Sequence, residues 1–287
     1  MLWRAPRAFS QQADPILAGR PLVRYPEKTD LILMTSRPPQ LETPMTYFDR
    51  AITPNEAFFV RYHTFPVPTG VDLGTWRLRV TGLVERPLEL SFEDLKTRFP
   101  KAAVTAVTQC AGNSRGRFSP RVLGGEWGDG AMGNAEWVGA RLRDLLAAAG
   151  VRQGAVQATF EGLDKPAFPS VPHFVKSLDL RRIVEDPDVI VAYQMNGREL
   201  PMLNGFPARL VVPGWYGDRG RRPRVREVLD EAGLPDSRHA VRLRRARHGA
   251  EEHRADPPHD GPLLHRLASE RRARRRRATR DAQGHRV

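Results

Sequence analysis

The chain has 287 residues, of which 40% are hydrophobic, 28% charged and 8% aromatic, a composition typical of a globular protein with a sizeable core. No apolar run approaches the ~18 residues that a membrane-spanning helix needs, so an integral membrane protein is excluded. A single cysteine, Cys110, excludes an internal disulfide framework and a multi-cysteine metal cluster. The region between Trp3 and Leu31 holds charges and prolines but no apolar stretch, so we expect no intact signal peptide.

The formal net charge of +13 is unevenly distributed along the chain. Residues 217–287 carry 20 Arg, 11 Asp and Glu and no Lys, which gives this segment a charge of +9. Every aromatic residue lies at or before Tyr216, so two different compositions meet near that residue. We expect residues 217–287 to form a disordered basic tail, because they offer too little apolar area to offset an ordering entropy of ~1–2 kcal/mol per residue.

In chain order, an extended N-terminal arm is expected over residues 1–42, because prolines punctuate it and no helical period persists. Alternation or β-favouring composition then predicts a series of strands. The expected strands span residues 57–63, 76–80, 103–108, 156–160, 189–193 and 208–212. One helix is expected to begin with Ser91 as N-cap and Asp94 three residues later, and another to span 138–149 and end at Gly150.

Interspersed strands, few helices and long loops indicate the α+β fold class, and the sequence contains neither a regular βαβ pattern nor an internal repeat. The expected short, buried strand over 103–108 leads directly to Cys110. A loop over 111–134 follows, with seven glycines. Long loops in compact domains are usually functional or disordered, and glycine lets a backbone approach a ligand closely. The loop after Cys110 is therefore a candidate ligand-binding segment.

Taken one at a time, the polar residues of this region leave several alternatives open. Cys110 suits a buried small hydrophobic residue as well as a nucleophile or ligand. An acyl-transfer pair with His63 or His173 is possible, but spacing does not select it. A zinc site would need more ligands than one cysteine and two histidines supply.

Four further residues have equally ordinary interpretations. Arg61 and His63 alternate on one face of an expected strand, which is typical of a solvent-facing polar edge. Arg209 suits a salt bridge at a strand end, and Asp164 suits a turn.

Seven segments, in family order, resemble the sulfite oxidase family of molybdopterin enzymes. The first is similar to the family's cofactor-binding segment, and the second to its molybdenum-ligating cysteine motif. The seven segments are 54–63 (PNEAFFVRYH), 109–113 (QCAGN), 130–137 (GAMGNAEW), 160–164 (FEGLD), 193–197 (YQMNG), 203–207 (LNGFP) and 209–216 (RLVVPGWY). The similarity is greatest to the bacterial sulfite dehydrogenase branch. It implies a molybdopterin-binding oxidoreductase domain with mixed sheets and few helices over residues 43–216.

The resemblance also implies the cofactor, molybdenum-molybdopterin, and the residues that hold it. Cys110 would supply a thiolate, a soft ligand suited to a transition metal that is also bound by pterin sulfurs. Arg61 would lie beside the metal's oxo group and bind the anionic substrate through charge-assisted hydrogen bonds. The implied cofactor-binding residues are Phe59, Val60, Arg61, His63, Cys110, Asp164, Asn204 and Arg209. Asn204 stands where the animal enzymes have histidine.

The implied reaction is oxygen-atom transfer that converts sulfite, or a similar small oxyanion, to its oxidised product. Two electrons would then pass one at a time to a haem acceptor of the cytochrome c type. Family members are often homodimers, and the bacterial ones are usually periplasmic. The resemblance gives no reason to expect a membrane span or a nucleic-acid partner.

The tail departs from the family pattern. After Tyr216 the family continues with a Trp-Val-Lys-type segment, an active-site tyrosine and an immunoglobulin-like dimerisation domain, and residues 217–287 contain no counterpart of these. We therefore expect the domain to be incomplete at its C-terminal end. We also expect the chain as written to be monomeric, to bind molybdopterin weakly and to oxidise sulfite poorly or not at all.

Three interpretations of the tail are open. Its arginines would neutralise nucleic-acid phosphates, although no aromatic residue is present to stack on bases. It would also suit a plain solvated, charged tail. The third interpretation is a shifted reading frame in a GC-rich gene, in place of the dimerisation domain. One codon choice for residues 258–269, read one base later, gives His-Met-Thr-Val-Arg-Ser-Phe-Ile-Ala-Ser-Pro, which resembles the family's entry into that domain. This match favours the third interpretation, and a nucleic-acid-binding protein remains the alternative function. The nucleotide sequence after codon 216 would separate them.

Overall fold

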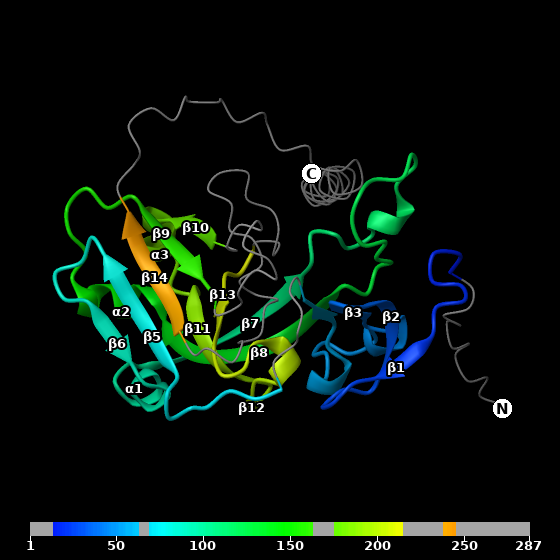
Figure 1. Ribbon diagram of the computed structural model, residues 1–287, viewed down its shortest axis with the longest axis horizontal. Coiled ribbons are helices and arrows are strands. Elements are labelled where there is room, and N and C mark those ends of the chain that lie inside the picture. Colours follow the sequence, from blue (N-terminus) through cyan, green and yellow to red (C-terminus); the bar gives the residue numbers. More distant parts are fainter. Residues whose placement is uncertain (1–13, 63–68, 163–174, 215–237, 245–287) are drawn as a thin grey trace, which may run out of the picture. The chain divides into compact units, whose positions relative to one another are not determined.

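The computed structural model describes residues 14–62, 69–162, 175–214 and 238–244 (Figure 1). The chain divides into two compact units, Met1–Ala246 and Arg247–Val287, and every described residue belongs to the first. Three sheets and a few short helices build this unit, which confirms the predicted α+β class. Among the described residues, no helix has both the length and the apolar character needed to cross a bilayer.

A four-stranded antiparallel sheet with the order β1-β2-β3-β4 lies at the start of the chain. Its strands are β1 (Leu22–Arg24), β2 (Asp30–Ser36), β3 (Pro39–Glu42) and β4 (Val60–Arg61). The sheet buries Leu31, Leu41 and Val60 in a small core of its own. The expected extended arm is therefore wrong for residues 22–42. Pro39 begins β3, where a missing N–H costs little, so the prolines mark strand boundaries instead of preventing strands.

A second antiparallel sheet has the order β12-β11-β8-β7, with β13 also paired to β11. Its strands are β7 (Lys101–Gln109), β8 (Met132–Arg141), β11 (Ile190–Met195), β12 (Arg198–Glu199) and β13 (Arg209–Val211). β7 and β8 pair from Lys101↔Ala140 to Gln109↔Met132. Because Cys110 directly follows β7, this long hairpin places the cysteine at the base of the loop that joins the two strands.

The third sheet has the order β10-β9-β14-β5-β6. Its strands are β5 (Arg77–Gly82), β6 (Leu88–Leu90), β9 (Gln157–Glu161), β10 (Val175–Asp179) and β14 (Arg238–Arg244). Figure 1 shows β14 between β5, to which it is parallel, and β9, to which it is antiparallel. This strand differs from the disorder expected across residues 217–287, most of which lie outside the described residues.

The physical reason for β14 is backbone hydrogen bonding between distant parts of the chain. β5 and β9 would each present a row of N–H and C=O groups, and a strand between them satisfies both rows. The composition of residues 217–287 does not indicate that two distant strands have N–H and C=O groups to be paired.

The helices are short. They are α1 (Phe92–Thr97), α2 (Leu142–Ala149) and α3 (Leu180–Glu185), with 3-10 turns η2 (Met45–Tyr47), η3 (Asn55–Ala57), η4 (Arg115–Arg117) and η5 (Met202–Asn204). The predicted capping box of α1 is confirmed, since Ser91 Oγ accepts the Asp94 N–H at 3.0 Å and Asp94 accepts the Ser91 N–H at 2.9 Å. The predicted end of α2 at Gly150 is also confirmed, but the helix begins at Leu142 because the preceding residues belong to β8.

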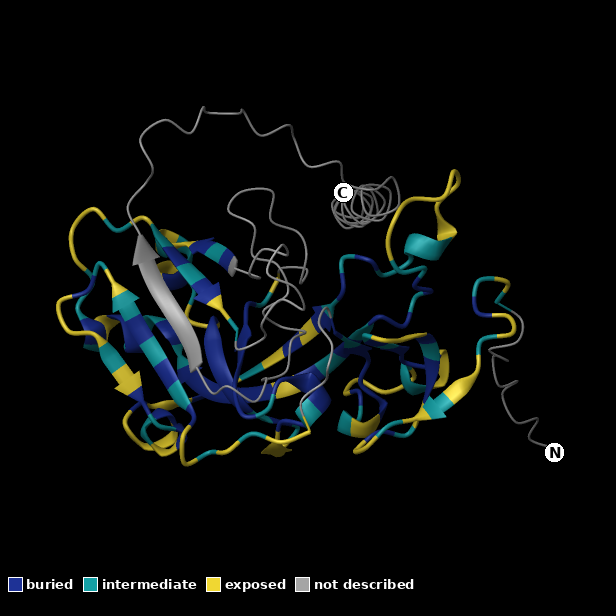
Figure 2. Ribbon diagram, viewed as in Figure 1, coloured by how far each residue is buried: buried dark blue, intermediate teal, exposed yellow. Residues whose placement is uncertain are grey.

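Two of the predicted strands need correction. The segment expected over 57–63 forms a strand only at β4, because η3 occupies Asn55–Ala57. The strand expected over 103–108 is the longer β7, and it is buried on one face only: Ala106 is buried, whereas Val107 is 52% exposed. The other expected strands correspond to β5, β9, β11 and β13. Figure 2 shows the buried residues along the inner strands of the sheets.

Candidate functional site

Hydrogen bonds to nearby backbone groups fix the position of Cys110 directly after β7. Its N–H donates to the Ala131 carbonyl at 2.9 Å, and its Sγ accepts the Gly112 N–H at 3.3 Å. The side chain is only 2% exposed and lies in the main hydrophobic core. The thiolate is the form of cysteine that binds metals.

The loop between β7 and β8 is closed by hydrogen bonds between its two ends. The Asn113 side chain accepts the Ala131 N–H at 2.8 Å, so the first turn of the loop bonds to its last residues. Ser114 N–H donates to the Gly128 carbonyl at 2.6 Å, and Gly116 N–H donates to the Trp127 carbonyl at 2.9 Å. The glycine-rich segment predicted to bind a ligand therefore has a defined conformation next to Cys110.

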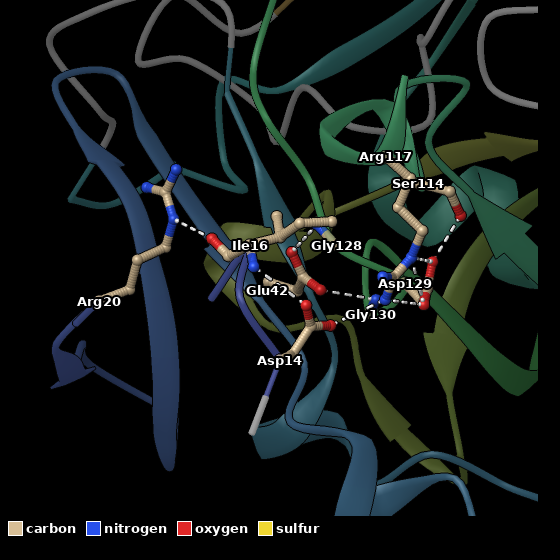
Figure 3. Close-up of polar contacts among 9 residues, drawn as sticks. All are labelled: Asp14, Ile16, Arg20, Glu42, Ser114, Arg117, Gly128, Asp129 and Gly130. Carbon is tan, nitrogen blue, oxygen red and sulfur yellow. Dashed lines mark hydrogen bonds and ion pairs between the residues drawn. The ribbon is translucent and has the colours of Figure 1, made fainter. Parts of the chain in front are cut away.

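A charged cluster braces the outer part of this loop (Figure 3). Arg117 Nε lies 3.0 Å from both carboxylate oxygens of Asp129, and Arg117 Nη2 lies 2.7 Å from Asp14. Ser114 Oγ donates to Asp129 at 2.7 Å. The hydrogen bond from Arg117 lowers the pKa of Asp129, and the same contact raises the pKa of Arg117. Both residues thus remain charged and hold the loop.

A second carboxylate, Glu42, contacts the loop from inside. Its two oxygens accept the N–H groups of Gly128 at 2.8 Å and Gly130 at 2.7 Å, and the residue is fully buried (Figure 3). Burial raises the pKa of Glu42, and the two N–H donors act in the opposite direction. The sequence analysis did not identify Glu42, because it lies in the segment taken as an arm.

The predicted cofactor segment reaches the loop through aromatic packing. The Phe59 and Trp127 rings meet edge to face at 6.5 Å, and both side chains are almost completely buried. Val60 is buried and Arg61 is partly exposed at the end of β4, where Arg61 Nη1 donates to the Tyr62 carbonyl at 2.9 Å. The structure therefore places Phe59 against the loop that carries Cys110.

Asn204 and Arg209, both buried, join η5 and β13 to the same segment. Asn204 Nδ2 donates to the Phe59 carbonyl at 3.0 Å, and Arg209 Nη1 donates to the Asn204 carbonyl at 2.8 Å. The Arg209 guanidinium also lies over the Trp137 ring, 4.9 Å from its centroid. Two predicted cofactor residues thus contact each other, and Asn204 contacts a third.

Lys28 completes this buried group, and the sequence analysis missed it. Its Nζ donates to the Asn55 carbonyl at 2.7 Å, to the Phe58 carbonyl at 3.1 Å and to Asn204 Oδ1. Burial lowers the pKa of Lys28 to about 7. Both ends of the Asn204 amide are therefore occupied by protein groups.

The predicted site is connected in part by these contacts. Phe59, Asn204 and Arg209 form one hydrogen-bonded group, and Phe59 packs on the loop of Cys110. His63 and Asp164 lie outside the described residues. A single pocket lined by Arg61, His63, Cys110, Asp164 and Arg209 stays a prediction.

The donor set and buried polar atoms near Cys110 fit a metal–pterin group. Within the described residues, which exclude His63 and Asp164, no cluster of three or more His, Cys, Asp or Glu side chains could hold a metal ion. Two buried polar atoms, Trp127 Nε1 and Gln40 Oε1, make no hydrogen bond to the part of the chain that the structure describes. A Cβ on Gly125 would lie 3.0 Å and 2.6 Å from these atoms, so glycine is required for the backbone to pass them. A polar ligand group could satisfy both atoms.

Comparison with known proteins identifies the family. The model of the oxidoreductase molybdopterin binding domain matches residues 64–222. Sulfite oxidase of Gallus gallus is 43% identical over 222 residues, which are 75% of this chain and 46% of that protein. Mitochondrial sulfite oxidase of Rattus norvegicus is 40% identical over 217 residues, 73% of this chain and 39% of that protein. The chain thus spans less than half the length of these curated relatives.

A solved structure supports the same assignment. The crystal structure of the sulfane dehydrogenase SoxCD from Paracoccus pantotrophus superposes with a TM-score of 0.57 at 26% identity, covering 85% of this chain and 57% of that chain. The chain belongs to the sulfite oxidase family of molybdopterin-dependent oxidoreductases.

Proposed function

We propose that this chain binds molybdenum-molybdopterin through Cys110 and oxidises sulfite or a similar small oxyanion. The observation that carries the proposal is the position of the only cysteine, at the end of β7, with an N–H directed at its sulfur. The buried Trp127 and Gln40 atoms that make no hydrogen bond to described residues give a polar ligand a reason to bind there. When bound, the cofactor supplies oxygen-atom transfer and two-electron redox chemistry.

The described residues have distinct roles in this proposal. Cys110 provides the thiolate ligand, and Arg61 on β4 provides positive charge for an anionic substrate. Arg209 is a permanent buried cation, suited to the pterin or its phosphate. Asn204 is a positioning residue, because its amide already bonds to Lys28 and to the carbonyl of Phe59.

Three parts of the proposal rest on the family resemblance alone. His63 and Asp164 are proposed to contact the cofactor. Electrons are proposed to leave to a haem acceptor of the cytochrome c type. The chain is proposed to be a monomer with reduced turnover, because residues 217–287 depart from the family pattern.

Sulfite and a reduced sulfane sulfur are the two candidate substrates. Two curated relatives are named as sulfite oxidases, whereas the structural neighbour is named as a sulfane dehydrogenase. The higher sequence identity favours sulfite. A reduced sulfane sulfur is the second candidate, and both substrates can be compared on one purified protein.

The test is to express the full chain in a host that makes molybdopterin and to measure bound molybdenum and pterin. Cytochrome c reduction is then followed with sulfite and, separately, with thiosulfate as a sulfane donor. We expect bound molybdenum in the wild type and much less in Cys110→Ser, with sulfite the better of two slow reductants. Equal molybdenum content in both proteins would contradict the proposal.

A further inference from the structure

Strand β3 contacts both halves of the proposed site. Its backbone pairs with β4 through Gln40↔Arg61 and Leu41↔Val60, so it determines where Arg61 lies. The last residue of β3 is Glu42, whose carboxylate accepts two N–H groups of the loop that follows Cys110. One short strand therefore joins the predicted substrate-binding arginine to the predicted metal-binding loop.

The contact between β3 and the loop uses three hydrogen bonds. Glu42 accepts the N–H groups of Gly128 and Gly130, and the Thr43 N–H donates to the Gly130 carbonyl at 3.1 Å. Gly130 must be glycine for this approach, whereas a Cβ on Gly128 would displace the end of the Glu42 side chain. A Cβ on Gly130 would lie 2.0 Å from the Thr43 carbonyl oxygen, and one on Gly128 would lie 2.7 Å from Glu42 Oε1.

Only one peptide unit separates this contact from Cys110. Gly130 is bonded to Glu42, and the carbonyl of the next residue, Ala131, accepts the Cys110 N–H at 2.9 Å. The Ala131 N–H donates to the Asn113 side chain at 2.8 Å, which holds the turn after the cysteine. A shift of Gly128 and Gly130 would therefore move the Ala131 carbonyl, which accepts the Cys110 N–H, and the Ala131 N–H, which holds Asn113.

The Glu42 carboxylate is suited to binding two loop N–H groups at once, and no shorter or neutral side chain could make both hydrogen bonds. A carboxylate accepts two N–H groups at once, one on each oxygen. A glutamine offers a single acceptor, and its NH₂ would face one of the two N–H donors. Full burial makes the carboxylate costly to keep, with Asp14 and Asp129 nearby adding negative charge. The two hydrogen bonds to the loop N–H groups offset part of this cost, and they fix the positions of Gly128 and Gly130.

We propose that Glu42 is a positioning residue that holds the Cys110 loop in register with the Arg61 strand. Its meaning for catalysis rests on the proposed function, but its mechanical role does not. Without Glu42 the loop opens, Cys110 becomes accessible, and the separation of the thiolate and the arginine is no longer set.

The single cysteine makes the proposal testable on the full chain without cofactor. Alkylation by iodoacetamide reports only on Cys110, which is 2% exposed, so its rate measures loop opening. We expect Glu42→Gln to raise the rate by roughly tenfold or more, because it leaves one of the two buried loop N–H groups without an acceptor and facing an NH₂ group. The matched control is Asp94→Asn, which also removes a carboxylate that accepts a backbone N–H, but in the α1 cap. We expect that control to change the rate less than about twofold, since α1 and the loop open independently.

A second variant guards against a Glu42→Gln protein that fails to fold. Gly128→Ala places its Cβ against Glu42 Oε1 and displaces the carboxylate while keeping its charge. Faster alkylation of Glu42→Gln, or of Gly128→Ala if Glu42→Gln does not fold, supports the proposal when the urea midpoint for global unfolding is unchanged. A wild-type rate in that same variant overturns it, and so does an equal increase in Asp94→Asn.

Molybdenum content separates this inference from the proposed function. Faster alkylation of Glu42→Gln together with a wild type that takes up no molybdenum supports the role of Glu42 and contradicts the cofactor assignment. Molybdenum uptake that depends on Cys110, with unchanged alkylation of Glu42→Gln, supports the cofactor assignment and overturns the role of Glu42.

Discussion

The sheet that ends at Cys110 and the sheet that contains β14 are built in opposite ways. β7 and β8 are joined by one loop and pair along nine consecutive positions, from Lys101↔Ala140 to Gln109↔Met132. β14 is inserted between β5 and β9 from the far end of the chain, parallel to one and antiparallel to the other. The β7–β8 pair is encoded by neighbouring segments, whereas the β5–β14–β9 arrangement depends on a distant segment of different composition. Stability in the two sheets should therefore respond to different changes.

The largest expected effect comes from proline in β14. Val241→Pro removes a backbone donor from the strand between β5 and β9, a position in the middle of a sheet where proline is not tolerated. Hydrogen exchange should show lost protection in β5 and β9 and retained protection in β7 and β8. Val241→Ala keeps the N–H and serves as the control. Protection that falls equally in both sheets, or in neither, would show that β14 is not a separate support.

Truncation after Tyr216 tests the same comparison in another way. It removes β14 altogether, so the amides of β5 and β9 that faced β14 should exchange faster and the shortened chain should aggregate through these open edges. Light scattering and hydrogen exchange measure both effects. Tight, salt-dependent DNA binding by the full chain that disappears on truncation would instead support the nucleic-acid alternative.

A smaller loss is expected from Lys28→Met, which acts on the Cys110 side of the comparison. The substitution leaves the Asn55 and Phe58 carbonyls and Asn204 Oδ1 without their donor, at a cost of about 2–4 kcal/mol. Urea unfolding measures the loss. Lys96→Met, on the exposed side of α1, is the control and should change the free energy of unfolding by less than about 0.5 kcal/mol. Similar losses in the two variants would contradict the structural role of Lys28.

The pH dependence of stability sharpens the test of Lys28. Its pKa of about 7 in the folded chain lies below the ordinary value of 10.5, so between these values the unfolded chain binds more protons. The free energy of unfolding should therefore rise with pH across that window, and the rise should be absent from Lys28→Met. The three acceptors around Nζ favour the ammonium form and oppose the burial effect. Parallel wild-type and variant curves from pH 7 to 10 would mean that Lys28 keeps its charge in the fold.

The smallest expected effect is local to α1. Ser91→Ala removes the hydroxyl that accepts the Asp94 N–H and should cost about 1 kcal/mol. Thermal unfolding measures the loss, and α1 amides should exchange faster. Because α1 lies apart from the hydrogen bonds around Cys110, the alkylation rate of Cys110 should stay unchanged.

The parts of the fold that were predictable have local signals. Alternation indicated β5 and β9, and Ser91 with Asp94 indicated the cap of α1, because each depends on residues close in sequence. β14 had no such signal, since its role comes from the edges of two distant strands. The strands at 22–42 were missed because prolines were taken as interruptions, although they stand at strand ends.

The site residues also differ in whether a local sequence signal identifies them. Cys110 and Phe59 were identified through motifs, and the structure places Phe59 against the loop of Cys110. Glu42 lies 86 and 88 positions from the two glycines it bonds, and Lys28 lies 176 positions from Asn204. A charged residue in an apolar segment acquires such a role only when the chain folds, so spacing alone could not indicate either residue.

The most direct measurement is molybdenum K-edge X-ray absorption on the purified full chain and its Cys110→Ser variant. If Cys110 is the protein ligand, the wild type contains molybdenum with one more sulfur neighbour than any molybdenum retained by the variant. The Glu42→Gln variant should keep the same sulfur neighbours at reduced occupancy. Equal sulfur counts and equal occupancy in the wild type and Cys110→Ser would contradict the assignment of Cys110 as the metal ligand.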